Sequence, residues 1–237
     1  MAKYYSFVSG LPQLKWDSKP PFEFSEWIAL VRSYLTKDDN EIFSSVLLIY
    51  DIRNLVSIKK GEKPPHEPAN FTYKDLEGFL RQPSMALDFM ERFLISEEDY
   101  DDALEMLYID YYDNILKKVR LPILKDYIYL ELALLRTQSK IQLKNEAYKK
   151  EISADALHIA ENKLPDILSQ TSDLKKMQAN YDLVLWDFLS ERIACRHWSM
   201  EVIIAYHLKL MLLEKWHEIR TADGDSLLEE ISMEVNI

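Results

Sequence analysis

The residues of this chain that could do chemistry are mostly acidic. The run from Glu97 to Asp102 is almost entirely carboxylate and could bind a divalent cation. The same run falls where a helix is expected to start, and a helix N-terminus favours negative charge. It also lacks the glycine turn and the terminal bidentate glutamate of an EF-hand loop. We therefore interpret the run as a helix start, with a cation site as the alternative.

Part of this run has a spacing used by metal-dependent enzymes. Asp101-Asp102-Ala103-Leu104-Glu105 matches the Asp-Asp-x-x-Asp/Glu motif with which all-α isoprenoid synthases hold magnesium and diphosphate. Such a site needs a second acidic cluster on a facing helix. The nearest match is Asp182, Asp187 and Glu191, which lacks the expected pattern of hydroxyl ligands. A magnesium-dependent enzyme acting on isoprenoid diphosphates is therefore a remote alternative.

The histidines do not form a metal site by spacing alone. His197 and Glu201 would lie one helical turn apart, and His207 and His217 fall roughly on the same face. A third ligand is not evident, so ordinary helix histidines are the preferred interpretation and a zinc site the alternative. Cys195 lies two residues from His197 and would face another way. We predict no catalytic residue, no metal and no cofactor.

The elements that carry these residues are predicted to be helices. Three hydroxyl residues each precede an acid by three positions, which is typical of a helix N-terminus: Thr36 with Asp39, Thr72 with Asp75, and Ser96 with Asp99. The first opens a helix that runs to Lys60, where Gly61 and a proline-rich loop end it. That helix is apolar on most sides and is expected to be buried.

Further helices are expected from the periodicity of apolar residues and the positions of prolines. Tyr4 to Val8 reads as a short strand or an apolar anchor. The chain has four glycines, fewer than sheets and phosphate-binding loops require, so the fold is predicted to be all-α. The remaining expected helices span 75–80, 84–95, 97–119, 123 to beyond 150, 168–196 and 199–220.

Composition limits the classes of function. The 237 residues are 48% apolar and 29% charged, which is ordinary for a globular protein. A net charge of −11 disfavours nucleic acid and anionic lipid as partners. The single cysteine fits a reducing compartment, the start is too short for a signal peptide, and the longest apolar stretch is too short to span a bilayer. We expect a cytoplasmic protein without a small-molecule substrate.

Three segments resemble copies of one unit: residues 46–55, 127–136 and 206–215. Asp51 and Glu131 lie 80 residues apart, and Tyr127 and Tyr206 lie 79 apart. This spacing predicts a single helical domain of three pseudo-repeats, roughly 1–80, 81–160 and 161–237.

The repeated segments resemble the C subunit of archaeal and bacterial V/A-type ATPases, the equivalent of the vacuolar ATPase d subunit. The family phrase is an acid followed by Asn-Leu and a basic residue, on a helix with a Pro and a Tyr-Leu. It is matched by Asp51 to Leu55 with Lys59 and Lys60, and by Pro122, Tyr127, Tyr129 to Glu131, and Leu135-Arg136. The opening Tyr4 to Pro12 looks like a bacterial group of unassigned function encoded beside V-type ATPase genes.

The resemblance implies a non-catalytic, funnel-shaped helical socket. Such a socket sits peripherally on the membrane rotor ring, receives the foot of the central shaft, and couples the two during proton or sodium transport. A free-standing helical protein–protein interaction module is the alternative.

The resemblance also gives candidate residues. Socket polar residues would be Asp51, Asn54, Glu131 and Arg136, although a buried hydrogen-bond bridge between packed helices is the preferred interpretation of Asp51 and Asn54. Apart from the resemblance, the helical spacing of Arg136, Lys140 and Lys144 predicts a basic stripe that could contact an acidic partner, although a solvated helix face is the preferred interpretation. The chain departs from the phrase at Leu134, Leu210 and Leu213, and we expect the last two to be packed in the core.

Overall fold

A computed structural model describes residues 3–97, 100–139, 174–194 and 199–221. All regular elements in these residues are helices, which confirms the predicted all-α class. The chain divides into two compact units, one formed by residues 22–120 and the other by residues 1–21 with 121–237. We call them the inserted unit and the terminal unit.

The inserted unit is built around α3 (Lys37–Lys60). It also contains α2 (Phe24–Tyr34), α4 (Tyr73–Arg81), a 3-10 turn at Pro83–Met85, α5 (Asp88–Ile95) and α6 (Tyr100–Lys118). Helix α3 packs on α4 and α6, and α5 packs on α6. The residues of α3 from Val46 to Ile52 are buried without interruption. The prediction that this helix is apolar on most sides is therefore confirmed.

The ends of α3 and α4 follow the predicted signals. Gly61 ends α3 with φ of 77°, a left-handed conformation that costs glycine nothing. Thr72 and Asp75 form a complete capping box at the start of α4. At the start of α3 the Thr36 hydroxyl bonds the Asp39 carboxylate rather than the backbone. Ser96 ends α5, and α6 begins at Tyr100.

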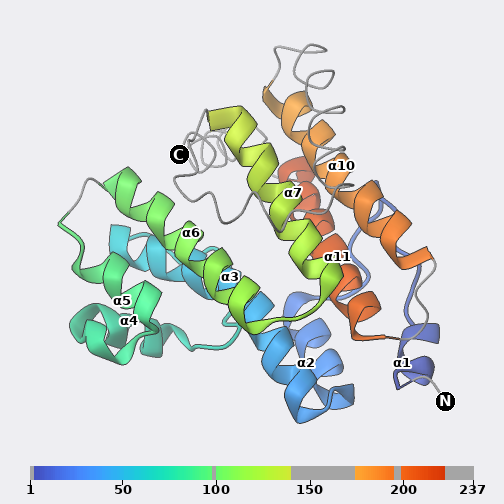
Figure 1. Ribbon diagram of the computed structural model, residues 1–237, viewed down its shortest axis with the longest axis horizontal. Helices are drawn as coiled ribbons and strands as arrows, with labels where there is room; N and C mark the ends of the chain where they lie inside the picture. Colours follow the sequence, from blue (N-terminus) through green and yellow to red (C-terminus); the bar gives the residue numbers. More distant parts are fainter. Residues whose placement is uncertain (1–2, 98–99, 140–173, 195–198, 222–237) are drawn as a thin grey trace. The chain divides into compact units, whose positions relative to one another are not determined.

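The terminal unit consists of α1 (Tyr5–Ser9), α7 (Pro122–Ser139), α10 (Leu174–Ala194) and α11 (Met200–Thr221) in its described part. Helices α7, α10 and α11 pack pairwise and run side by side in Figure 1. Helix α11 is buried continuously from Val202 to Leu210 and is the central element. The expected continuation of α7 beyond residue 139 lies outside the described residues.

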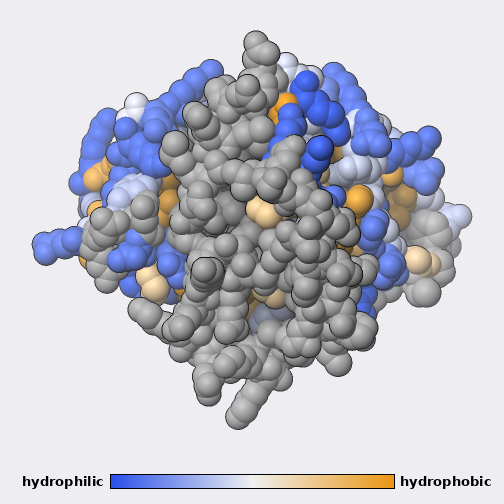
Figure 2. Space-filling model, turned by 90° about the horizontal axis from the view of Figure 1, so that it is seen from above, coloured by the Kyte–Doolittle hydropathy of each residue, from blue (hydrophilic) through white to orange (hydrophobic). Residues whose placement is uncertain are grey.

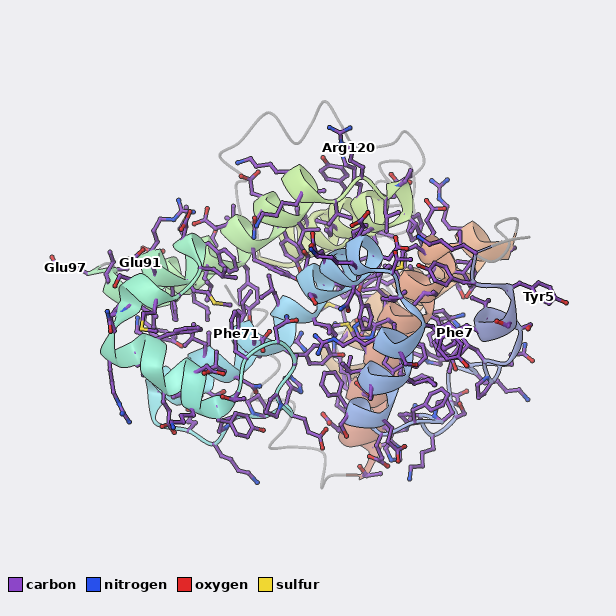
Figure 3. All side chains as sticks on the ribbon, turned by 90° about the horizontal axis from the view of Figure 1, so that it is seen from below. Tyr5, Phe7, Phe71, Glu91, Glu97 and Arg120 are labelled. Atoms are coloured by element: carbon purple, nitrogen blue, oxygen red, sulfur yellow. The ribbon has the colours of Figure 1, made fainter. Side chains whose placement is uncertain are left out.

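The segment from Tyr4 to Val8 lies at the start of the short helix α1 (Tyr5–Ser9), so the alternative of a strand is wrong. Phe7 is 5% exposed and Tyr5 is 52% exposed, and Figure 3 shows their side chains on different sides of α1. Tyr4 is buried as well. The alternative of an apolar anchor is therefore the one that the structure supports.

The three predicted copies all lie on helices, namely α3, α7 and α11. The predicted boundary near residue 80 falls inside α4, and the boundary near 160 lies outside the described residues. The two units begin and end elsewhere, at 21/22 and 120/121. The threefold repeat and the funnel stay predictions.

No described helix is both long enough and apolar enough to cross a membrane. On the face seen in Figure 2, hydrophilic side chains cover most of the described surface and apolar ones are scattered among them. This surface is the one expected from a chain with 29% charged residues.

Candidate functional site

Two polar side chains of the first repeat are completely buried in the middle of α3. Asp51 and Asn54 are both 0% exposed and lie about one helical turn apart. Burying such groups costs free energy unless hydrogen bonds replace the lost water. Their partners therefore show what this part of the helix is built to hold.

The Asp51 carboxylate holds the end of the loop between α3 and α4. It accepts hydrogen bonds from the backbone amide of Asn70 at 3.1 Å, from the Asn70 side-chain amide at 2.8 Å and from the Phe71 amide at 3.2 Å. Burial raises the pKa of the Asp51 carboxyl, and the bonds from Phe71 and Asn70 oppose that shift. One carboxylate thus fixes two consecutive backbone amides.

The Asn70 side chain also bonds to the backbone of α3 and to a side chain of α2. Its side-chain amide nitrogen also donates to the Ser44 carbonyl at 2.9 Å, and its oxygen accepts from Arg32 of α2 at 3.0 Å. Residues 32, 44, 51 and 70 therefore form one continuous network. The network joins α2, α3 and the loop within the inserted unit.

Asn54 holds the middle of the same loop. Its side-chain oxygen accepts from the His66 backbone amide at 3.0 Å, and the Tyr73 hydroxyl donates to the His66 carbonyl at 2.7 Å. The His66 ring meets Tyr50 edge-on at 5.2 Å. Burial and the nearby Arg53 lower the pKa of His66 to about 3, so the imidazole is neutral at pH 7.

We call this arrangement of Asp51 and Asn54 with residues 66–71 the loop clamp. The sequence predicts a hydrogen-bond bridge from Asp51 and Asn54 to another helix, and the partner is different. Both side chains bond directly to the loop between α3 and α4. The partners lie 12 to 20 residues further along the chain. No local sequence pattern identifies them.

The basic residues of the family phrase are engaged inside the same unit. Lys59 donates to the Phe93 carbonyl at 2.8 Å, and its ammonium lies 4.1 Å from the centre of the Phe93 ring. Lys60 lies over the Tyr100 ring at 5.1 Å. Both lysines therefore connect the end of α3 to neighbouring elements of the inserted unit.

The terminal unit has a buried acid of its own, Asp182 on α10. Its carboxylate is 2.8 Å from the Lys215 ammonium and accepts from the Trp216 indole at 2.7 Å and from Gln178 at 3.1 Å. All three partners are side chains on helices. Asp182 is a candidate metal ligand by sequence, and it is instead a contact between α10 and α11.

A serine and a buried lysine also meet between α10 and α11. Lys209 donates to the Ser190 hydroxyl at 2.8 Å and lies 4.0 Å from the centre of the Trp186 ring. Burial lowers the pKa of Lys209 to about 8, and Asp187 opposes the shift.

A Ser–Lys acyl-transfer site requires the lysine to accept the serine proton. Here the Ser190 hydroxyl donates to the Trp186 carbonyl at 2.7 Å and accepts from Lys209. The pair therefore forms a polar contact between α10 and α11.

The candidate metal ligands are divided between the two units. Asp102 is exposed and Glu105 partly exposed on α6 of the inserted unit, whereas Asp187 and Glu191 are exposed on α10 of the terminal unit. Within the described ranges, no three His, Cys, Asp or Glu side chains form a group that could hold a metal.

The histidines of the zinc alternative differ in their surroundings. His207 is 1% exposed, and burial lowers its pKa to about 3. Glu201 and His217 are partly exposed. His197 and Cys195 lie outside the described residues.

The other predicted site residues lie in α7 and beyond. Glu131 is partly exposed on α7, and the backbone of Arg136 belongs to the same helix. Lys140 and Lys144 lie outside the described residues. Leu210 and Leu213 are 1% and 0% exposed, so their predicted place in the core is confirmed.

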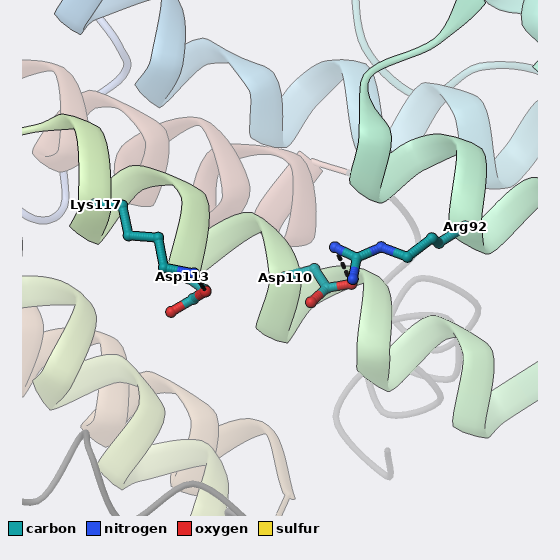
Figure 4. A network of polar contacts seen from close by, with 4 residues as sticks. All are labelled: Arg92, Asp110, Asp113 and Lys117. Atoms are coloured by element: carbon teal, nitrogen blue, oxygen red, sulfur yellow. Dashed lines mark hydrogen bonds and ion pairs between the residues drawn. The ribbon is translucent and has the colours of Figure 1, made fainter. Parts of the chain in front are cut away.

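A surface network on α5 and α6 completes the polar contacts (Figure 4). Arg92 lies 2.9 Å from Asp110, and Lys117 pairs with Asp113 one turn away on α6. Burial raises the pKa of Asp110, and Arg92 opposes the shift. Exposed pairs of this kind contribute about 0–1 kcal/mol each, so the network stabilises the α5–α6 hairpin modestly.

Comparison with known proteins identifies a family whose function is unknown. The family described as a protein of unknown function, DUF2764, matches residues 1–236, and the chain belongs to it. No curated protein matches the chain significantly. No solved structure does so either.

Proposed function

We propose that this chain is a non-catalytic socket, similar to the C subunit, of a bacterial V/A-type rotary ATPase. The loop clamp is the observation that carries the proposal. It lies on the helix with the most complete family phrase, and it uses the acid and the asparagine of that phrase together. In the clamp these two polar residues make a surface loop rigid, and a part that transmits torque needs rigid contact surfaces.

The clamped loop lies at the surface. Glu62, Lys63 and Glu67 are exposed on the loop, while Asp51 and Asn54 hold its backbone from beneath. A loop fixed in this way loses little conformational entropy when a partner binds. We propose that it contacts the central shaft or the polar loops of the membrane ring.

Two further observations support the proposal. The three segments that resemble the family phrase lie on α3, α7 and α11, and α3 and α11 each have a continuous buried stretch, from Val46 to Ile52 and from Val202 to Leu210. The buried acids Asp51 and Asp182 are both engaged in packing contacts, as a stiff mechanical part requires. Under this proposal the protein is cytoplasmic, associates with the inner membrane through the ATPase, and takes part in proton or sodium transport without a cofactor.

The test is recovery of partners from native membranes. Affinity-tagged chain, extracted under conditions that preserve ATP hydrolysis, should bring down the shaft or the ring. A variant with Glu62→Lys and Glu67→Lys changes the loop surface but not the clamp, and it should recover several-fold less of them. Lys118→Glu, an exposed change on α6, is the control and should recover as much as the wild type.

Recovery of the chain without any other ATPase component, from membranes whose ATPase remains active, would contradict the proposal. Recovery of a different, constant partner would instead favour the alternative of a free-standing interaction module. Equal recovery by the loop variant would leave the socket in place but show that the clamped loop is not the contact.

A further inference from the structure

Residues 12–17, which we call the strap, lie along α11 of the terminal unit. The Tyr206 hydroxyl donates to the Pro12 carbonyl at 3.0 Å, near the start of α11. Asp17 lies 3.9 Å from Arg220, near the end of that helix. The strap therefore follows α11 from one end toward the other.

A single aromatic side chain of the strap contacts both helices. Trp16 meets Trp186 of α10 edge-on, with ring centres 5.4 Å apart, and meets Trp216 of α11 at 6.2 Å. Trp186 and Trp216 are 7% and 5% exposed, whereas Trp16 is partly exposed. The partly exposed Trp16 ring thus packs on the outer side of two buried tryptophan rings.

The two buried rings are held by groups that do not belong to the strap. Asp182 accepts from the Trp216 indole, and the Lys209 ammonium lies over the Trp186 ring. The surface that receives Trp16 is therefore built by α10 and α11 themselves. It is expected to keep its form when the strap leaves.

The polar contacts that hold the strap are weak. One hydrogen bond joins it to Tyr206, and the ion pair of Asp17 is long and has a 90% exposed carboxylate, which contributes little. In contrast, α1 just before the strap buries Phe7, and the adjoining Tyr4 is buried too. The strap is therefore held mainly by the Trp16 ring, whereas α1 is held by buried side chains of its own.

We propose that the surface of α10 and α11 that the strap contacts, which we call the strap site, is a docking site for an extended segment of another protein chain that carries a tryptophan followed by an acid. Trp186 and Trp216 would take the aromatic ring, Arg220 the acid, and Tyr206 a backbone carbonyl. A buried aromatic contact supported by a few polar ones is a common mode of peptide recognition. The strap would compete with such a segment for the strap site.

This inference is independent of the proposed ATPase role. It requires only that the strap site binds a segment of another chain through the same contacts that it makes with the strap. When the strap occupies the site in most molecules, an outside segment binds more weakly, in proportion to the fraction of molecules whose site is free. A substitution that weakens the strap should therefore increase the affinity for an outside segment.

The experiment measures binding of a fluorescent peptide with the sequence of residues 10–21 to the full-length chain, by anisotropy. Trp16→Ala should bind the peptide at least about tenfold more tightly than the wild type, because its own strap no longer fills the aromatic site. Trp16→Phe, which keeps a smaller ring and is safer for folding, should fall between them. A peptide with Ala in place of its tryptophan should bind none of the three.

Gln13→Ala is the matched control, since Gln13 is an exposed residue of the strap. It should bind the peptide as weakly as the wild type does. Equal affinity of the wild type, Trp16→Phe and folded Trp16→Ala for the peptide would overturn the inference, as would binding of the alanine peptide. Neither result would bear on recovery of the ATPase shaft or ring.

Discussion

The two units bury their polar side chains against different kinds of partner. In the inserted unit, Asp51 and Asn54 accept hydrogen bonds from the backbone of a loop. In the terminal unit, Asp182 and Lys209 contact side chains of neighbouring helices. A buried helix can thus use polar groups either to shape a surface loop or to fix how helices pack.

The difference has consequences for what a substitution should disturb. The Asn70 and Phe71 amides share one carboxylate as acceptor, so the loop should change its conformation locally when that carboxylate is removed. A side chain such as Lys215, which is 27% exposed, can turn toward water. We therefore expect the loop clamp to be more sensitive than the contacts between α10 and α11.

The largest effect is expected for Asp51→Ala. The substitution leaves the Asn70 and Phe71 amides without their acceptor and should lower the free energy of unfolding by about 3–5 kcal/mol. Urea denaturation measures the loss, and proteolysis should cleave the loop in residues 62–71 faster. Asp38→Ala, an exposed acid in the first turn of the same helix, should cost less than about 1 kcal/mol.

Asp182→Ala should cost less, about 2–3 kcal/mol, because only the Trp216 indole is a buried donor without an alternative. Tryptophan fluorescence should change in this variant, while proteolysis of the loop at residues 62–71 should not. Faster cleavage of that loop in Asp182→Ala than in Asp51→Ala would contradict the expectation that Asp51 is the residue that fixes the loop.

Lys209→Met should change the pH dependence of stability. The pKa of Lys209 is about 8 in the folded chain and 10.5 as a free side chain, so between these values the unfolded state binds more protons and stability rises with pH. From pH 8 to 10 the wild type should gain roughly 1–2 kcal/mol relative to Lys209→Met. Parallel curves for the two proteins would show that Lys209 is not desolvated.

The smallest effect is expected at the start of the clamped loop. Gly61→Ala places a side chain at φ of 77° and should cost about 1 kcal/mol. Gly78→Ala is the matched control inside α4, where an added Cβ meets nothing within 4 Å, and it should be neutral or slightly stabilising. Thermal denaturation of the two variants compares them directly, and a loss at Gly78 as large as that at Gly61 would rule out the backbone conformation as the cause.

The sequence predicts helices best where local chemistry marks their ends. Thr36 marks the start of α3, and Gly61 with the prolines after it marks the end at the correct residue, Lys60. Helix α2 is missed, because Glu23 precedes it without a side-chain cap and no hydroxyl with a following acid marks its start. The five-residue α1 is too short to show a helical period.

The candidate site is less predictable because its partners are distant in sequence. The spacing of Asp51 and Asn54 indicates that the two share a face and need partners. It does not identify Asn70, whose contacts depend on how the loop returns to α3. Nor does spacing bring together Trp16 and Trp216, which lie 200 residues apart and meet through tertiary packing.

The proposed role in a rotary ATPase is tested most directly by the amount of this chain in the intact complex. Native separation of detergent-extracted membranes, followed by quantitative mass spectrometry of the ATP-hydrolysing band, gives the ratio of the chain to the shaft. We predict one copy of the chain for each shaft. An active band that contains ring and shaft but none of this chain would contradict the account.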